Sequence, residues 1–331
     1  MPTQLASIGS SIQSFFEAVG SFFESVGALN VGPLALAAVA FIAYLSLRAR
    51  AFFHALRAAY PAERFRFRRI WGAYIAAYGL NNVIPARGGD IMKLYLVKTS
   101  IPNSHYPAVG AAFFVEAVFD AVMAVFILTF AFTQGNFPKP PDFADLDAFD
   151  LSFFASNPRL TLFVLTALVV GFLVLFAVLS ARVKAFWARV RQGVVILKDR
   201  RRYLREVFAW QLAGWGLRFT AMWFFLEAFN IGGSVHNVLL VLGTYAVAAV
   251  VPFTPSGAGV QQALILKVFA GTAAGATVAA YSVGLAIAIA ATTLTVGFLA
   301  LVFIFDIRSF KEAVRQGRAD RERAEATGQP V

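Results

Sequence analysis

Five polar or charged side chains lie close together in an otherwise apolar part of the chain: Asn81, Asn82, Arg87, Asp90 and Lys93. The planar guanidinium of Arg87 can bind a phosphate through two parallel hydrogen bonds. A helix that begins near Asp90 would add free backbone N–H groups and the positive end of its dipole. These residue types therefore predict an anion-binding site. An ion pair between Arg87 and Asp90 that only stabilises a loop is the alternative, because buried charges need partners whatever their function.

Two carboxylates and an arginine lie inside segments that are apolar enough to cross a membrane. Glu116 and Asp120 are four residues apart and share one helix face. Arg218 lies in the middle of residues 207–229, with no acidic residue within one turn. Because charges at such depth are costly, we expect the carboxylates to carry a proton or to neutralise Arg87, Lys93 or Arg218. A static ion pair between helices is the alternative.

A second polar group lies beside Pro252 and Pro255, which interrupt any helix at that point. It supplies uncharged donors and acceptors from Thr254, Ser256, Gln261 and Gln262. We interpret these four as ligand contacts. The alternative is ordinary turn chemistry, because such residues are common in loops.

Other kinds of site are excluded or disfavoured by the sequence. Zero Cys and three scattered His predict that there is no metal site, and no nucleophile accompanies the carboxylates, so we expect neither an enzyme nor a cofactor. The glycines of GAGVQQ follow no strand, which argues against a dinucleotide loop. The formal charge of +11 comes from short basic runs between apolar stretches, a pattern typical of membrane topology and not of nucleic-acid binding.

The composition identifies the class of protein that positions these residues. Of 331 residues, 59% are hydrophobic and only 14% are charged. One soluble core cannot bury that much apolar surface. The chain is therefore predicted to be an all-α polytopic membrane protein.

Five stretches have the length of about 20 apolar residues that a bilayer requires: 29–47, 108–132, 160–180, 207–229 and 275–305. Two further apolar pieces, 70–98 and 237–270, are each interrupted by a proline-containing turn. At 1.5 Å per residue their longer arms reach only about 22 Å, which is less than the thickness of the hydrocarbon core.

The charges of the connecting segments predict the orientation. Residues 48–69 carry seven Arg against one Glu, and 181–206 carry nine basic against two acidic residues, so both are expected in the cytoplasm. Residues 133–158, with four Asp against one Lys, are expected outside. Counting crossings then makes 70–98 and 237–270 re-entrant helical hairpins that enter from opposite faces. The N-terminus is expected outside and the C-terminus in the cytoplasm.

Opposed hairpins suggest an inverted repeat. AAYGLNNVIPARGGDIMKLYLVK aligns with GTYAVAAVVPFTPSGAGVQQALILK, which pairs Tyr78 with Tyr245 and Pro85 with Pro252. One transmembrane domain, 29–305, would contain repeat 1 (29–132), a connector helix (160–180) and repeat 2 (207–305), followed by a basic tail (306–331). Broken helices that meet near the midplane are typical of transporters.

The first 28 residues contain two similar pieces, SFFEAVG and SFFESVG, with phenylalanines on one helical stripe opposite Glu17 and Glu24. Because they lack the basic start of a secretory signal, we expect residues 1–28 to remain and to lie on the membrane as an amphipathic helix. A homodimer contact through the same stripe is the alternative.

NNVIPARGGDIMKLYLV and VPFTPSGAGVQQ make the chain resemble the transmembrane region of lysylphosphatidylglycerol synthases and related flippase-like proteins. The resemblance covers about residues 29–305, and Asn-x-x-x-Pro-x-Arg-x-Gly-Asp is its most specific part. One position departs from it, because the Glu-Arg-x-x-Asp of that family reads Glu-Ala-x-x-Asp here, with Ala117 in place of the arginine.

The resemblance implies that the chain moves a lipid between leaflets of the cell membrane. The expected substrate is an anionic phospholipid or a lipid-linked headgroup, held in a polar cavity between the hairpins while the repeats rock. Its movement would be driven by an ion gradient or by the lipid gradient. The alternative is a non-transporting scaffold or lipid-binding subunit for a separate synthase or glycosyltransferase.

Overall fold

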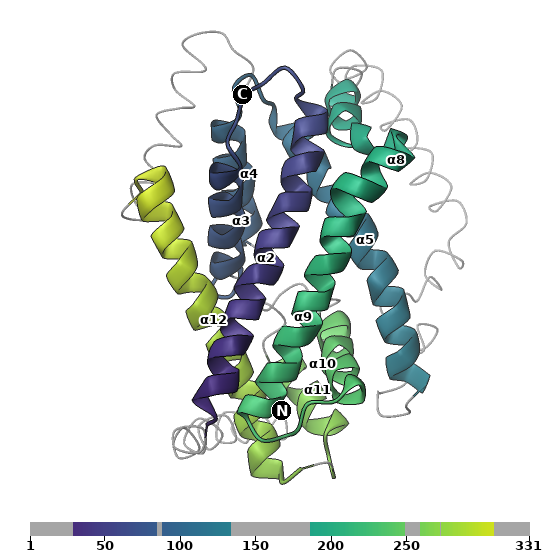
Figure 1. The fold of residues 1–331 in the computed structure, drawn as a ribbon, viewed down its shortest axis with the longest axis vertical. Helices are drawn as coiled ribbons and strands as arrows, with labels where there is room; N and C mark the ends of the chain where they lie inside the picture. The colour runs from purple at the N-terminus through teal and green to yellow at the C-terminus, as the bar shows by residue number, and fades with distance from the viewer. Residues whose placement is uncertain (1–28, 85–87, 134–185, 249–258, 272, 308–331) are drawn as a thin grey trace, which may run out of the picture.

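The computed structural model describes residues 29–84, 88–133, 186–248, 259–271 and 273–307. Within these residues the chain is helical, and extended pairing is confined to one isolated bridge between Ala270 and Ala273. Figure 1 shows the helices as one elongated bundle. The predicted all-α class is therefore confirmed for the part of the chain that is described.

The first half of the bundle consists of α2 (Val31–Ala59), α3 (Phe67–Asn81), α4 (Gly88–Ser100) and α5 (Tyr106–Thr133). The second half consists of η4 (Val195–Lys198), α8 (Arg200–Tyr203), the π-helix η5 (Leu204–Phe208), α9 (Ala209–Ala228), α10 (Val235–Ala248), α11 (Val260–Val268) and α12 (Gly275–Phe305). The predicted amphipathic segment 1–28, the connector helix 160–180 and most of the tail 306–331 lie outside the described residues.

Three of these helices have the length and apolar composition of a membrane span: Val31–Ala59, Tyr106–Ala131 and Gly275–Phe305. They coincide with three of the five predicted spans, and the chain is a multi-pass membrane protein. The fourth prediction, 207–229, corresponds to α9, whose polar residues include Gln211 and Arg218.

The first span is longer than predicted, because α2 continues to Ala59 instead of ending at residue 47. Phe52, Leu56 and Ala59 extend the buried stripe of the helix, and the N–H of Tyr60 closes its last turn on the carbonyl of Leu56. Pro61 then follows. The prediction that the connecting segment begins at residue 48 is therefore wrong, and Arg48 lies buried inside a helix.

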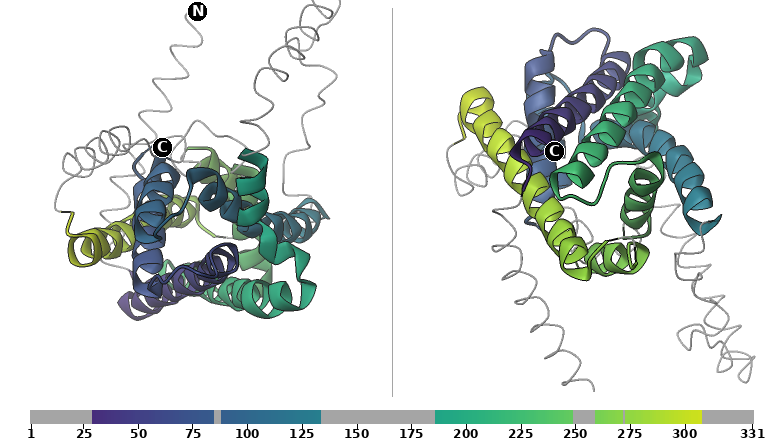
Figure 2. Two further views of the ribbon diagram at one scale, coloured as in Figure 1. Left: turned by 90° about the horizontal axis from the view of Figure 1, so that it is seen from above. Right: turned by 60° about the horizontal axis from the view of Figure 1, so that its bottom comes forward.

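Two pairs of shorter helices lie at opposite ends of the bundle (Figure 1). α3 and α4 pack against each other near the end at which α2 ends, while α10 and α11 lie at the end at which α2 begins. α2 runs beside α9, and α3 also packs on α12; the two views of Figure 2 agree with this arrangement. α3 and α4 lie within the predicted first hairpin, 70–98, apart from the start of α3 and the end of α4, and α10 and α11 lie within or beside the predicted second hairpin, 237–270.

Small residues let α3 approach the backbone of α12. A Cβ atom added to Gly79 would lie 2.7 Å from the carbonyl oxygen of Thr293, and one added to Gly297 would lie 3.0 Å from the Cα of Ala76. Such contacts between small residues are a main source of helix packing in membranes, where lipid tails are as apolar as leucine. The first hairpin is thereby held against a full-length span.

We expect Gly79→Ala to lower the stability of the protein by about 1–3 kcal/mol, because backbone atoms of α12 must move to admit the methyl group. Gly216→Ala is the matched control, since nothing lies within 4 Å of a Cβ at that helical position. The control should be neutral or slightly stabilising, as alanine is the better helix former. Thermal unfolding in detergent measures both, and equal melting temperatures would contradict the close α3–α12 contact.

Candidate functional site

A buried arginine is joined to one of the predicted carboxylates by two hydrogen bonds. The guanidinium of Arg48 donates from Nη1 to Oδ1 of Asp120 at 2.8 Å and from Nη2 to Oδ2 at 2.6 Å. Trp215 also donates from Nε1 to Oδ1 of Asp120 at 3.3 Å. The pair connects α2 to α5, and Trp215 attaches α9 to both.

The second predicted carboxylate pairs with a lysine from the first hairpin. Nζ of Lys93 donates to Oε2 of Glu116 at 3.4 Å, and these side chains are only 9% and 6% exposed. Oε1 of Glu116 is buried and has no hydrogen-bond partner among the described residues. The ammonium also lies 4.1–4.8 Å from the ring centroids of Phe113, Tyr74 and Phe52. Aromatic faces attract a cation, so the rings and the carboxylate together hold Lys93.

Tyr74 of α3 connects the two ion pairs. Its hydroxyl accepts a hydrogen bond of 2.9 Å from Nε of Arg48, while its ring lies against the ammonium of Lys93. Tyr44, one turn before Arg48 on α2, contributes a further hydroxyl at 3.3 Å from Nη1. Side chains from α2, α3, α4, α5 and α9 thus form one network, which we call the charged network: Arg48, Tyr74, Lys93, Glu116, Asp120 and Trp215.

The i, i+4 spacing explains how single helices present these groups together. Glu116 and Asp120 lie one turn apart, as the sequence predicts, and each faces a cation from a different neighbouring helix. Asp120 lies at the middle of α5 (Tyr106–Thr133) and Arg218 at the middle of α9 (Ala209–Ala228). The charges therefore lie far from both ends of the bundle.

Arg218 lies beside the charged network but makes no ion pair with an acidic residue within the described ranges. Its guanidinium carbon lies 4.7 Å from the ring centroid of Trp215, 5.6 Å from that of Tyr245 and 5.7 Å from that of Tyr44. The aromatic faces offset part of the cost of placing a cation there. The N–H groups of the guanidinium are left available to an anion.

Two of the predicted contacts of the second hairpin have different roles. Gln261 is buried and hydrogen-bonds with the side chain of Tyr245, and its Nε2 has no partner. Gln262 instead accepts from the N–H of Gly259 at 2.6 Å and caps the start of α11. Gln261 thus adds a donor near Arg218, whereas Gln262 stabilises the helix. Thr254 and Ser256 lie outside the described residues.

The polar residues of the first hairpin also have different roles. Nδ2 of Asn81 donates to Oδ1 of Asp90 at 3.1 Å, which ties the end of α3 to the start of α4. Nδ2 of Asn82 donates to Oγ1 of Thr293 on α12 and to the carbonyl of Tyr78, both at 3.1 Å. Lys93 points instead to Glu116 on α5. Arg87 lies outside the described residues.

Sequence reasoning missed Arg48 and the aromatic residues around Lys93. Arg48 was counted with the basic residues of the connecting segment 48–69. The helical spacing of Arg48, Phe52 and Leu56 on one face would have extended the helix and placed this arginine on its buried side. The aromatic side chains carried no comparable signal, because phenylalanine and tyrosine are abundant throughout the chain.

We expect Asp120→Asn to destabilise the protein by about 3 kcal/mol, because it removes the counter-charge of a buried guanidinium. This is near the lower limit for such pairs, since the Asp120 side chain is 38% exposed. Replacing both partners, as Arg48→Met with Asp120→Leu, should recover most of the loss, and Arg205→Gln at an exposed position is the control. Thermal unfolding in detergent tests this; an Asp120→Asn variant as stable as the wild type would show that the pair contributes nothing.

Arg218 and Gln261 supply hydrogen-bond donors of the kind that can bind an anion. The described residues contain no group of three or more His, Asp or Glu that could hold a metal ion. Comparison with curated proteins returns no match, and neither does comparison with solved structures. A family model described as "Lysylphosphatidylglycerol synthase TM region" matches residues 6–300. Because this match covers most of the 331 residues, the chain belongs to the family of lysylphosphatidylglycerol synthase transmembrane regions.

Proposed function

We propose that the chain moves a lipid with an anionic phosphate headgroup between the two leaflets of the membrane. Its family is one of membrane domains linked to lipid metabolism or transport. The observation that carries the proposal is Arg218, a cation at the middle of α9 that makes no ion pair with a described carboxylate and whose guanidinium lies beside Tyr245. A phosphate is the anion that a guanidinium binds best, through parallel hydrogen bonds.

The balance of charge supports an anionic ligand. Arg48 and Lys93 are neutralised by Asp120 and Glu116, which leaves Arg218 as the third cation against two carboxylates. Gln261 adds an N–H donor that has no partner in the described part of the chain, and its side chain and Arg218 both interact with Tyr245. Donors therefore outnumber acceptors at this point, as binding of a phosphate requires.

The hairpins support a path between the leaflets. Asn82 at the end of α3 reaches Thr293, near the middle of α12, and Tyr245 near the end of α10 reaches Arg218 at the middle of α9. Under the proposal both hairpins are re-entrant and their tips meet at membrane depth. Irregular backbone is tolerated there only where protein or a water-filled cavity satisfies it, which is the usual layout of a transporter site.

The orientation of the protein is part of the proposal. The end at which α2 ends carries most of the described arginines, so we place it in the cytoplasm of a cell-membrane protein. The lipid is the proposed partner. A non-transporting scaffold for a separately encoded synthase or glycosyltransferase is the competing function, and it is favoured only if no lipid moves.

Arg218→Gln should slow lipid movement roughly tenfold or more, because a charge-assisted contact to the headgroup is lost. Arg218→Lys should recover only part of the rate, since an ammonium lacks the planar pair of donors. The rate is measured with a fluorescent phosphatidylglycerol in vesicles that contain the purified protein, with Arg205→Gln as the control for a lost surface charge.

Melting temperatures of the same variants separate transport from folding. An Arg218→Gln protein that folds normally and moves lipid at the wild-type rate would contradict the assignment of the site. A wild-type protein that moves no lipid in either direction would favour the scaffold.

The geometry favours Glu116 over Asp120 as a proton carrier. Both oxygens of Asp120 accept from Arg48, whereas Oε1 of Glu116 has no partner and leaves room for a proton. If movement is coupled to protons through Glu116, the rate in wild-type vesicles should change with an imposed pH gradient, and Glu116→Gln should lose that response. Arg205→Gln should keep it. A rate that ignores the gradient in the wild type would exclude Glu116 as the carrier.

A further inference from the structure

We propose a second phosphate site at the end of the bundle at which α2 ends, where it holds the headgroup of an anionic lipid from the adjacent leaflet. The site consists of Arg50, Arg64 and Arg66 with Phe53, Phe67 and Trp210, and we call it the Arg50 cluster. None of these residues belongs to the charged network or contacts Arg218. The inference therefore stands whether or not the chain moves lipids.

Arg50 is held between aromatic rings from three helices. Its guanidinium carbon lies 5.0 Å from the ring centroid of Phe67, 5.4 Å from that of Phe53 and 5.9 Å from that of Trp210. Rings on several sides position the guanidinium without using its N–H donors. Within the described residues Arg50 makes no ion pair, so these donors are available to a ligand.

The segment before α3 adds two more arginines, because its successive side chains alternate between two sides of the chain. Residues 63–66 are not helical, and Phe65 and Phe67 pack edge-on against Phe53, with centroids 5.4 and 5.6 Å away. In an extended chain alternate side chains point to opposite sides. Arg64 and Arg66 are accordingly exposed. The phenylalanines anchor the segment while the arginines face outward.

Two neighbouring arginines, Arg57 and Arg68, form hydrogen bonds within the protein, unlike the three arginines of the Arg50 cluster. Arg57 donates to the carbonyl of Glu63 at 3.1 Å, and Arg68 donates to the carbonyl of Phe303 at the end of α12 at 3.2 Å. In contrast, Arg64 and Arg66, like Arg50, make no ion pair or side-chain hydrogen bond within the described part of the chain. Three arginines without an acidic partner in the described residues thus lie on α2 and on the segment that leads into α3.

The whole end of the bundle is positively charged. Residues 50–69 carry six Arg against Glu63, a net +5, and 198–206 carry five basic residues against Asp199 and Glu206, a net +3. Arg189 and Lys98 add further positive charge: burial lowers the pKa of the His105 imidazole, and these two cations lower it further. An anion approaching this end therefore meets a strongly attractive potential.

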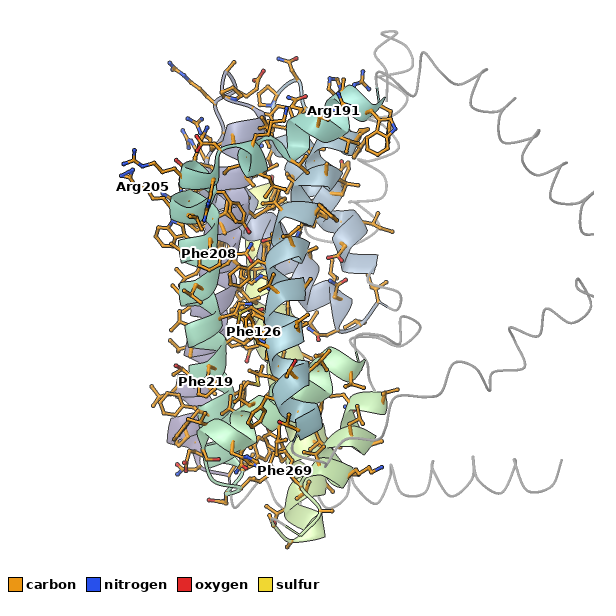
Figure 3. The ribbon with its side chains drawn as sticks, turned by 90° about the vertical axis from the view of Figure 1, so that its right-hand side faces the viewer. Phe126, Arg191, Arg205, Phe208, Phe219 and Phe269 are labelled. Carbon is orange, nitrogen blue, oxygen red and sulfur yellow. The ribbon has the colours of Figure 1, made fainter. Side chains whose placement is uncertain are left out.

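The position of the Arg50 cluster in the bundle indicates that the anion it binds is a lipid. Arg50 lies in the second half of α2, a candidate span, at the level where α3 and α9 begin, and Arg64 and Arg66 lie in the segment that connects α2 to α3. Exposed aromatic side chains lie at this end too: Phe186, Trp187 and Trp210. Figure 3 shows Arg191 and Arg205 at this end and Phe269 at the other. Aromatic and basic residues at the end of a span mark the headgroup level of a bilayer, where lipid phosphates are the most abundant anions.

The test compares lipids that differ only in headgroup charge. Native mass spectrometry in a neutral detergent would give apparent Kd values of the full chain for dioctanoyl phosphatidylglycerol and dioctanoyl phosphatidylcholine. Arg50→Gln with Arg66→Gln should weaken phosphatidylglycerol binding about fivefold per arginine, or on the order of 25-fold together, with little effect on phosphatidylcholine. Arg64→Gln with Arg66→Gln, both exposed, should fold normally and show a similar loss.

Two further variants make the result specific. Lys267→Gln removes the same charge from an exposed position at the opposite end and should leave both Kd values unchanged. Arg218→Gln should keep the preference for phosphatidylglycerol, which separates this site from the proposed transport site. The proposal is overturned if both double variants bind phosphatidylglycerol like the wild type, if Lys267→Gln loses as much, or if inorganic phosphate at the same concentration displaces the lipid.

Discussion

The ion pair between Arg48 and Asp120 is the interaction on which the arrangement of the helices depends. Removing the carboxylate would leave the guanidinium of Arg48 buried without its counter-charge, and the two parallel hydrogen bonds to Asp120 constrain how α2 approaches α5. Tyr74 then fixes α3 against Arg48, and Trp215 fixes α9 against Asp120. Apolar contacts in a membrane are weakly directional, so these polar contacts define which faces of the helices meet.

A second constraint acts through size instead of charge. Gly79 and Gly297 bring α3 so close to α12 that a single added methyl group would meet backbone atoms. That approach places Asn82 within hydrogen-bond distance of Thr293 and holds the end of the first hairpin beside the middle of a full-length span. The charged network and this close packing act on opposite sides of α3. The position of the hairpin therefore follows from both.

Much of this was predictable from the sequence, including one of the two ion-pair partners. The apolar length of α5 and α12 and the shared face of Glu116 and Asp120 follow from local periodicity. Lys93, which pairs with Glu116, was one of the three cations expected from the sequence, whereas Arg48, 72 positions before Asp120, was not, because local patterns do not assign so distant a partner. Ala117 illustrates the point: where the resembled family has an arginine on the carboxylate helix, this chain neutralises its carboxylates from α2 and α4. The end of α2 was predicted too early because several arginines follow the apolar stretch. Arg48 fits the charge pattern of a cytoplasmic loop, although its side chain is buried in the core.

Trp215 contacts both the proposed anion site and the ion pair between α2 and α5, so it is the residue that would couple ligand binding to the packing of these helices. Its indole N–H donates to Asp120, and its ring lies 4.7 Å from the guanidinium carbon of Arg218. Under the proposed function, a headgroup that binds Arg218 changes the position of the guanidinium relative to the indole ring of Trp215. A rotation of the indole in response would alter its hydrogen bond to Asp120. Because Asp120 also closes the α2–α5 contact, occupancy of the anion site changes the stability of that contact. Under the proposed function, the Arg48–Asp120 pair is therefore the contact through which headgroup binding would act on the packing of α2 against α5.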